Sequence, residues 1–258
     1  MKKILIGFIA IGLLTFVGCK KDDDADTETT DSTETSSDEG STDTSDEGTD
    51  SSTDDDTTET SSAEAKDADG YTYKTVKIGE QEWFAENLKT SKYNDGKPIP
   101  NIADDTEWSN DTIGAWSHYD NDNQYDSIYG KLYNWYAVET GKLCPTGWHV
   151  PTDAEWTVLT DYLTANGHSG LEGKALKATS GWFDYDDQSG NGTDDYGWNG
   201  LPGGFRYDYD GDFDDVGSNG NWWSSSDAWY RDLYSDSDSV YSFSEGKDYG
   251  FSVRCLRD

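Results

Sequence analysis

The stretch that decides the fold of this chain is Leu143-Cys144-Pro145-Thr146-Gly147-Trp148-His149-Val150-Pro151-Thr152-Asp153-Ala154-Glu155-Trp156. Thr152 and Glu155 have the spacing of a capping box, in which each side chain accepts a hydrogen bond from the free backbone N–H of the other residue. The box predicts a helix that begins at Asp153 and ends near Asn166 and Gly167. The residues expected on its buried side are Trp156, Leu159 and Leu163.

Turn-forming residues just upstream place a cysteine beside this helix. Pro151 cannot lie inside the helix, and Pro145 together with Gly147 forces a turn. The Cys144 thiol is therefore held at a fixed position beside the helix start, and we expect it to be tied to the last strand of the protein.

Shorter elements are expected on both sides of the central helix. Residues 71–78 and 81–84 form a predicted hairpin around a two-residue turn at Gly79 and Glu80. Residues 128–138 have apolar side chains at helical spacing and fit either a short helix or a buried strand. Further short elements are expected as a helical turn at 173–178 and as strands at 222–225, 229–234, 240–243 and 251–255.

The segment from residue 181 to residue 222 has no sustained hydrophobic period. It is rich in Gly, Asp, Asn and aromatic residues, and this composition predicts one long irregular loop. A loop of this length inside a compact domain is usually functional or ordered by a metal. We therefore expect the ligand site of the protein in this segment.

Composition divides the 258 residues into three parts. Residues 1–19 form a predicted targeting segment, residues 20–66 an acidic linker rich in Ser and Thr, and residues 67–258 the folded domain. All 11 Trp and all 17 Tyr lie in the third part, which is long enough to bury one core. The linker has no apolar period, so it is expected to be a disordered stalk that averages about 40 Å from end to end.

The net charge of −34 at pH 7 limits the partners. Nucleic acid and anionic bilayer surfaces are excluded, because binding phosphate groups requires clustered Lys and Arg. The charge suits solubility, repulsion from like surfaces, or the binding of cations. We expect a monomer.

The amino terminus predicts the cellular location of the protein. A short cationic start precedes an apolar run over residues 4–17 that is right for a signal peptide. The run ends in Phe16-Val17-Gly18-Cys19, which resembles the bacterial lipobox and predicts lipidation of Cys19. The acidic residues that follow resemble the surface-export signal of Bacteroidetes-type lipoproteins. The alternatives are an ordinary secretory peptide and a linker that simply begins with acids.

This address implies a protein that is lipid-anchored in the outer membrane and faces the cell exterior. It would contact the membrane through its N-terminal lipid only. With Cys19 lipidated, Cys144 and Cys255 are the remaining thiols, and a disulfide between them is the economical interpretation for an exported chain. The alternative is two separate buried thiols.

Six motifs in order resemble a known family. They are Gly79-x-x-x-Trp83-Phe84-Ala85-Glu86-Asn87-Leu88, Gly130-x-Leu132-Tyr133-Asn134-Trp135-Tyr136-Ala137-Val138, Cys144-Pro145-x-Gly147-Trp148-His149-Val150-Pro151, Leu201-Pro202-Gly203-Gly204, Trp222-Trp223-Ser224-Ser225-Ser226 and Gly250-Phe251-Ser252-Val253-Arg254-Cys255. This pattern resembles the Fibrobacter succinogenes major paralogous domain, over residues 67–258. The resemblance implies an α+β fold similar to C-type-lectin-like and formylglycine-generating-enzyme-like domains, with two helices, small twisted antiparallel sheets and a long loop that carries the ligand site. Members of the family are commonly exported surface lipoproteins.

Acidic clusters are candidate cation sites. Asp208, Asp210 and Asp212 lie near Gly211 with two further acids, and their hard oxygen ligands suit calcium. Clusters around Asp122 and Asp186 could serve as well. The alternative for each cluster is a solvated acidic loop. The Glu-Pro-Asn type of calcium motif used by sugar-binding fold relatives is missing from the sequence.

Aromatic residues of the same loop are candidate ligand-binding residues. They are Trp182, Tyr185, Trp198, Tyr207 and Tyr209, and they alternate with acids and Asn. Sugar rings stack on aromatic faces while Asp and Asn bind their hydroxyls, so the composition fits a glycan platform. The alternative is that these rings pack under their own loop.

No catalytic motif is found. His118, His149 and His168 are far apart in the sequence and lack zinc-site spacing, and we expect His149, next to prolines, to be structural. The sequence therefore predicts a non-enzymatic surface lipoprotein that binds an extracellular polysaccharide or glycoprotein. The alternatives are a glycan-acting hydrolase and a structural or adhesin subunit that recognises protein.

Overall fold

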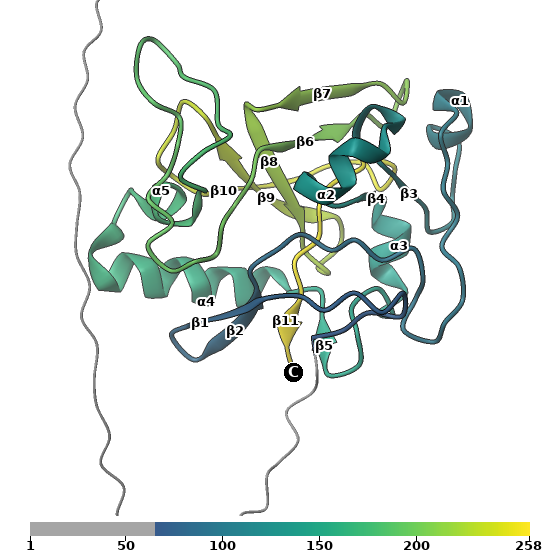
Figure 1. Ribbon diagram of the computed structural model, residues 1–258, viewed down its shortest axis with the longest axis horizontal. Helices are drawn as coiled ribbons and strands as arrows, with labels where there is room; N and C mark the ends of the chain where they lie inside the picture. Colours follow the sequence, from purple (N-terminus) through teal and green to yellow (C-terminus); the bar gives the residue numbers. More distant parts are fainter. Residues whose placement is uncertain (1–64) are drawn as a thin grey trace, which may run out of the picture. The chain divides into compact units, whose positions relative to one another are not determined.

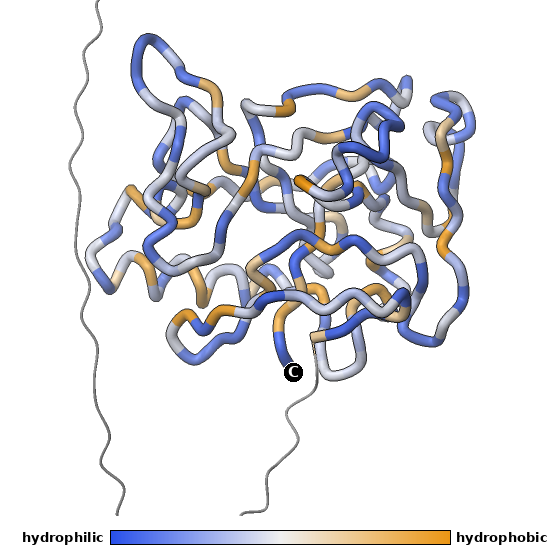
Figure 2. The backbone as a smooth tube through the Cα atoms, in the orientation of Figure 1, coloured by the Kyte–Doolittle hydropathy of each residue, from blue (hydrophilic) through white to orange (hydrophobic). Residues whose placement is uncertain are grey.

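The computed structural model describes residues 65–258 of the chain. The predictions for the signal peptide, Cys19 and nearly all of the acidic linker fall on residues 1–64 and lie outside the described residues. Within residues 65–258, none of the helices is long and apolar enough to cross a membrane. Figure 2 shows apolar residues in short stretches separated by hydrophilic ones, as in the central helix.

The described domain is mixed α and β, with few helices and several small, mainly antiparallel sheets (Figure 1). A four-stranded sheet has the order β1 (Thr75–Ile78), β2 (Gln81–Phe84), β11 (Leu256–Arg257) and β5 (Trp148–His149). A five-stranded sheet has the order β10 (Tyr241–Ser244), β9 (Trp229–Tyr234), β8 (Asn219–Trp223), β6 (Gly203–Arg206) and β7 (Phe213–Val216). A two-stranded sheet pairs β3 (Trp116–Ser117) with β4 (Leu132–Tyr133).

The helices are short except for one. The α-helices are α1 (Asp105–Trp108), α2 (Asp126–Tyr129), α3 (Trp135–Glu139), α4 (Asp153–Leu163) and α5 (Glu172–Leu176). Between them lie single helical turns, η1 (Tyr119–Asn121) and η2 (Asn123–Tyr125) before α2, and η3 (Thr164–His168) after α4. Only α4, with 11 residues, exceeds five residues among the described helices, so the expected two-helix arrangement is not what the described residues form.

The capping box predicted for α4 is present. The Thr152 hydroxyl accepts a hydrogen bond from the Glu155 backbone N–H, and the Glu155 carboxylate accepts one from the Thr152 backbone N–H at 2.8 Å. The helix begins at Asp153, as predicted, and its regular part ends just before Asn166 and Gly167. Its buried residues are Trp156, Leu159 and Leu163.

Two other local predictions are confirmed in substance. The hairpin forms with the predicted turn, although its first strand starts at Thr75 rather than at residue 71. The two alternatives for residues 128–138 are both realised, because β4 is followed directly by α3. Asn134 caps α3 by accepting a hydrogen bond from the Ala137 backbone N–H.

The prediction of one long loop from residue 181 to residue 222 is wrong for its second half. β6, β7 and most of β8 lie in this segment and form the centre and one edge of the five-stranded sheet. Glycines hide the strand pattern. At Gly220, a Cβ would lie 2.4 Å from the Trp222 ring, and at Gly204 it would lie 2.4 Å from the Asp214 carbonyl oxygen. The strands therefore pack closely without the apolar alternation that marks most strands.

The C-terminal segment joins the three sheets. Gly250 and Ser252 form single bridges to β6 and β8, Phe251 bridges to β4, and Leu256 pairs with both β2 and β5. Figure 1 shows this segment running from the five-stranded sheet down to β11. The predicted strand over residues 251–255 is thus replaced by these single bridges, and regular pairing begins at Leu256.

Candidate functional site

A pocket opens on one face of the five-stranded sheet, with a volume of about 190 Å³. Its floor comes from neighbouring strands, because Asn221 pairs with Asp232 and Asn219 pairs with Tyr234 across β8 and β9. Cross-strand partners point to the same side of a sheet, so the four side chains form one polar surface. Asp215 from β7 and Glu245 after β10 complete the polar lining.

Aromatic rings form the walls of this pocket. The rings are those of Phe205, Tyr207, Tyr230, Tyr249 and Phe251. They are in mutual contact, with centroid separations of 4.9 Å between Phe205 and Tyr207 and 4.5 Å between Tyr230 and Phe251. Such contacts fix the orientation of each ring. The walls are therefore preorganised around the polar floor.

Asp232 is the most unusual group in the pocket. Its side chain is 2% exposed, and burial raises the pKa of its carboxyl from 3.8 to about 7. Contact with the Tyr234 side chain opposes this shift, and the charge of Asp215 adds to it. Burial also raises the pKa of Tyr230, Tyr234 and Asp215.

Two buried acceptors of the floor lack a hydrogen-bond donor. They are Oδ1 of Asp232 and Oδ1 of Asn221, neither of which has a partner among residues 65–258. Both side chains are at most 3% exposed. A buried polar atom without a partner costs free energy and points to a role in binding or to a partner outside the chain.

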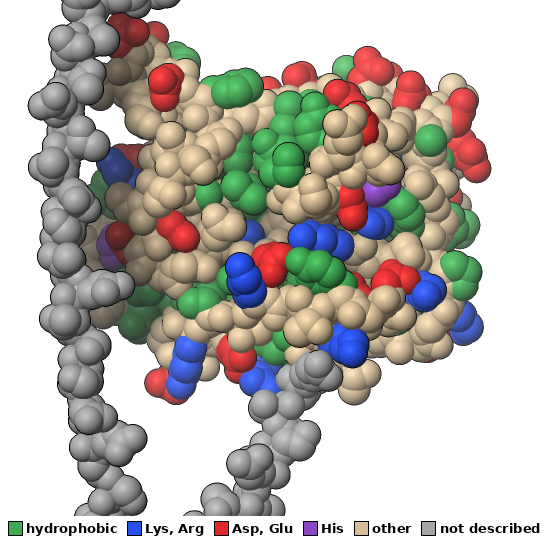
Figure 3. All heavy atoms as spheres, viewed as in Figure 1, with side chains coloured by type: hydrophobic (Ala, Val, Ile, Leu, Met, Phe, Trp, Pro, Cys, Tyr) green, Lys and Arg blue, Asp and Glu red, His purple; other side chains and the backbone are tan. Residues whose placement is uncertain are grey.

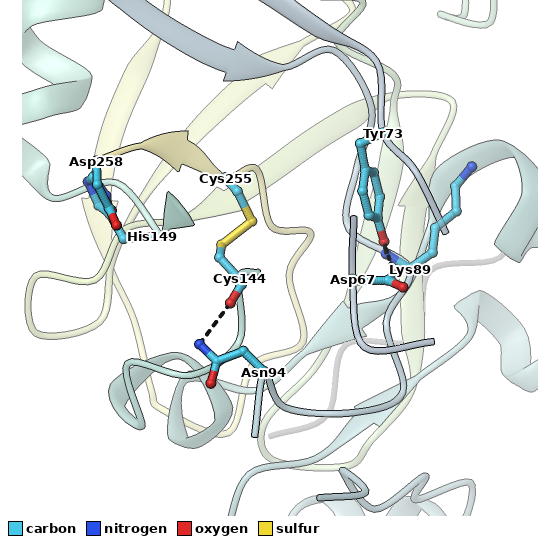
Figure 4. The surroundings of a disulfide bond; sticks show 8 residues. All are labelled: Asp67, Tyr73, Lys89, Asn94, Cys144, His149, Cys255 and Asp258. Atoms are coloured by element: carbon cyan, nitrogen blue, oxygen red, sulfur yellow. Dashed lines mark hydrogen bonds and ion pairs between the residues drawn. A yellow bond between two sulfur atoms is a disulfide. The ribbon is translucent and has the colours of Figure 1, made fainter. Parts of the chain in front are cut away.

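The predicted disulfide between Cys144 and Cys255 is present, with 5.9 Å between the Cα atoms. Both residues are buried, and Figure 4 shows Asn94 beside them, where its amide donates to the Cys144 carbonyl oxygen at 3.1 Å. His149 lies nearby and pairs with Asp258 through Nδ1 at 2.7 Å and with Glu155 through Nε2 at 3.0 Å. The disulfide holds the C-terminal segment to the turn that precedes α4.

The residues expected to bind a glycan are not brought to one place. Tyr207 lines the pocket, and Tyr209 lies against it with ring centroids 5.1 Å apart and 70% of its own side chain exposed. Tyr185 is exposed but lies outside the pocket, in a loop beside Lys174 and Asp238.

Trp182 and Trp198 require a correction, because both are buried in the core. Trp198 is 0% exposed and packs against Trp83, Trp156 and Trp222. The Trp182 indole donates to the Gly200 carbonyl oxygen at 2.9 Å. Neither ring has a free face for a sugar, so for these two residues the alternative of core packing holds. The rings fill space that aliphatic residues occupy in most domains.

The acidic clusters are also not assembled into metal sites. Asp210 and Asp212 are exposed and Asp208 is half-buried, and no group of three His, Cys, Asp or Glu residues in the described part of the chain is placed to hold a metal ion. These residues lie at the turn between β6 and β7, where the Tyr207 backbone N–H donates to the Asp212 carbonyl oxygen at 2.8 Å.

Sequence reasoning found Tyr207 and missed the other lining residues of the pocket, although three of them lie on a strand that it had found. β9 was expected at residues 229–234, and Tyr230, Asp232 and Tyr234 alternate along one of its sides. The sequence carried part of the signal, since Tyr230, Asp232 and Tyr234 occupy alternate positions of the expected strand and therefore share one face. A carboxylate in a strand that is buried on both faces is rare unless it has a role.

Figure 3 shows how charge is distributed over one face of the domain. Acidic side chains gather along the edge that carries β7 and α1, whereas Lys and Arg lie mainly over the half that holds β1 and β2. The five-stranded sheet that bears the pocket therefore has an acidic edge.

One family model matches the chain: the Fibrobacter succinogenes major domain, over residues 76–257. No curated protein and no solved structure matches the chain.

Proposed function

The chain belongs to the Fibrobacter succinogenes major domain family, and on this premise we propose that it is a lipid-anchored surface protein whose domain binds an extracellular polysaccharide or glycoprotein. In this proposal Cys19 carries the lipid, the outer membrane is the location, and the acidic linker holds the domain away from the membrane. The domain would act as a monomer with a C-type-lectin-like fold.

The pocket on the five-stranded sheet is the observation that carries this proposal. The half-buried rings of Tyr207 and Tyr249 suit the C–H faces of a sugar ring, and the carboxylates and amides of the floor suit hydroxyl groups. Its volume of about 190 Å³ is below the range of about 300–1,000 Å³ for sites that enclose drug-sized ligands. It is therefore suited to one sugar residue of a longer glycan.

A glycan array and a polysaccharide pull-down with the full chain test the proposal, each with and without EDTA. Retention of a glycan that is lost in Tyr249→Ala supports it. Tyr185→Ala is the matched control, because Tyr185 is an exposed tyrosine outside the pocket and should leave retention unchanged. Loss of binding in EDTA would add calcium to the site. The absence of retention on every glycan would overturn the proposal.

A glycan-acting hydrolase is the second candidate, and one observation favours it. Asp232, with its pKa raised to about 7, lies in the same pocket as Asp215 and Glu245. A carboxylic acid of raised pKa near a second carboxylate is the acid pair that glycosidases use. Release of reducing sugar by the wild type but not by Asp232→Asn would identify this activity, and binding without release would exclude it for that glycan.

A further inference from the structure

We propose that the group received by this pocket is a cationic amine, so that the sugar it recognises is an amino sugar with a free ammonium group. This inference rests on the proposed glycan binding and specifies its ligand class. Three features of the pocket support it independently: the charge of its lining, its unpartnered acceptors and its uncovered aromatic rings.

The lining carries acids without bases. Asp215, Asp232 and Glu245 line the pocket, and its lining contains no Lys, Arg or His. None of the three acids forms an ion pair with a residue of the described domain, whereas Asp126 and Asp153 pair with Lys131 and Arg231 at 2.7 and 2.6 Å. The pocket therefore lacks the cation that accompanies Asp126 and Asp153. A ligand that brings a positive charge supplies it.

The unpartnered acceptors need donors. Oδ1 of Asp232 and Oδ1 of Asn221 belong to directly paired residues of β9 and β8, so one small group can reach both. An ammonium has three N–H donors and no acceptor, and it can donate to both oxygens at once. A neutral hydroxyl has one proton to donate and would leave one of the two acceptors unsatisfied.

The pocket rings lack the cation that covers other aromatic residues of this domain. Arg254 lies 4.2 Å from the centroid of the Trp198 ring, and Lys247 lies 4.4 Å from that of Trp135. Within residues 65–258, no Lys or Arg side chain lies over any of the five rings that form the pocket walls. Of these rings, Tyr207 and Tyr249 are half-buried and the other three are buried. Aromatic rings next to carboxylates are typical of sites that bind ammonium groups.

The remaining polar groups favour an amine on a sugar over the amine of a lysine side chain. Asn219, Asp215 and Tyr234 are half-buried at the pocket and Glu245 is exposed there. The Asn219 amide donates to Asp215 Oδ2 at 3.0 Å, and the carboxylate oxygens of Asp215 and Glu245 can accept further hydrogen bonds from hydroxyl groups. The alkyl stem of a lysine has no hydroxyl groups to donate to these carboxylates. A hexosamine presents hydroxyls around its amine and an apolar C–H face to the rings.

Calorimetric titration of the full chain with a glucosamine disaccharide, compared with titration by the N-acetylated disaccharide, tests the inference. Acetylation removes the charge and retains the sugar. A disaccharide has only two charges, which keeps the general attraction of the acidic chain small. We expect the free amine to bind at least about tenfold more tightly, because hydrogen bonds to a charged group contribute more than neutral ones.

Variants separate the pocket from general electrostatics. Asp232→Asn should remove the preference for the free amine, whereas Asp161→Asn, which deletes one exposed carboxylate on α4 outside the pocket, should preserve it. Equal losses in both variants would contradict the inference, as would equal or tighter binding of the N-acetylated sugar.

Other outcomes distinguish this inference from the proposed function. Binding of neutral glycans in the pocket without a preference for amines overturns the inference and retains glycan binding. Nα-acetyl-lysine amide, which keeps a free ε-amine, stands for a lysine side chain. Its binding, with no response to either disaccharide, overturns the inference and the proposed function and identifies a protein ligand. No response to any amine or glycan also overturns both.

Discussion

The surroundings of Asp232 oppose the ionised form of its carboxyl. Its carboxyl has a pKa of about 7 in the folded domain, against an ordinary value of 3.8. At a pH between these two pKa values, the carboxyl has lost its proton in the unfolded chain and retains it in the folded domain. Stability from this residue is therefore present below about pH 4 and is lost as the pH rises to 7. A group that costs stability at neutral pH is a common sign of a binding site.

The first prediction is that Asp232→Asn stabilises the domain in a pH-dependent way. The amide cannot ionise, so the free energy of unfolding should rise by up to about 4 kcal/mol at pH 8 and change little at pH 4. Urea denaturation at both pH values measures this. Asp161→Asn, an exposed acid on α4, should have no such effect. An increase of equal size at both pH values would show that the carboxyl is not perturbed.

The second prediction concerns the disulfide. Cys144 and Cys255 close a loop with a sequence separation of 111 residues, and removing such a cross-link gives the unfolded chain more freedom. The double variant Cys144→Ala with Cys255→Ala should lose about 2–5 kcal/mol of stability. Thermal denaturation under non-reducing conditions measures the loss. If reduction of the wild type leaves its melting temperature unchanged, the cross-link contributes nothing.

At the scale of elements, the five-stranded sheet depends on close approach at its glycines. Gly204 lies in β6 with a φ of +61°, and a Cβ there would meet the Asp214 carbonyl oxygen and the Tyr119 ring at 2.4 and 2.8 Å. The nearest atoms belong to the backbone of β7, which cannot move aside as the end of a flexible side chain would. The register between β6 and β7, which places Asp215 at the pocket, relies on this contact.

The third prediction follows from that contact. Gly204→Ala should destabilise the domain by about 2–4 kcal/mol, through an unfavourable φ and the clash with β7. Gly96→Ala is the matched control, because Gly96 also has a positive φ, +81°, but nothing lies within 4 Å of the new Cβ. It should cost only about 1 kcal/mol. Equal costs in the two variants would mean that the strands separate without penalty.

At the scale of the whole molecule, the described domain is closed by its own C-terminal segment. This segment contacts all three sheets and carries Arg254, which is 0% exposed. The Arg254 guanidinium donates to Asn87 Oδ1 at 2.7 Å and to the Asn199 carbonyl oxygen at 2.9 Å, and burial lowers its pKa to about 9. A charged side chain at the centre joins residues that are more than 100 positions apart.

The fourth prediction concerns the proposed anchor. Cys19→Ala should abolish incorporation of labelled fatty acid and move the protein from the membrane fraction to the soluble fraction, because several acyl chains anchor stably and one alone is marginal. Fractionation of cells that express either form measures the shift. Unchanged membrane association would exclude the lipid as the anchor and leave an uncleaved signal segment to explain it.

Features set by neighbouring residues could be predicted from the sequence. The capping box at Thr152 and Glu155 and the turn at Gly79 act over four residues or fewer, so the residue types alone specify them. The pairing of Cys144 with Cys255 followed from the count of thiols. The family motifs indicated the domain, and its model matches residues 76–257.

The pocket was decided by tertiary structure. Its lining comes from residues spread between 205 and 251, on several strands and the segments between them. The alternation within one strand does not show which other strands pair with it. Trp198 was expected at the surface and became core, while Asp232 was unnoticed and became the floor of the site. A sequence specifies caps and turns through contacts between near neighbours. Which polar and aromatic side chains share a surface depends on how distant strands pair, and only the folded chain determines that.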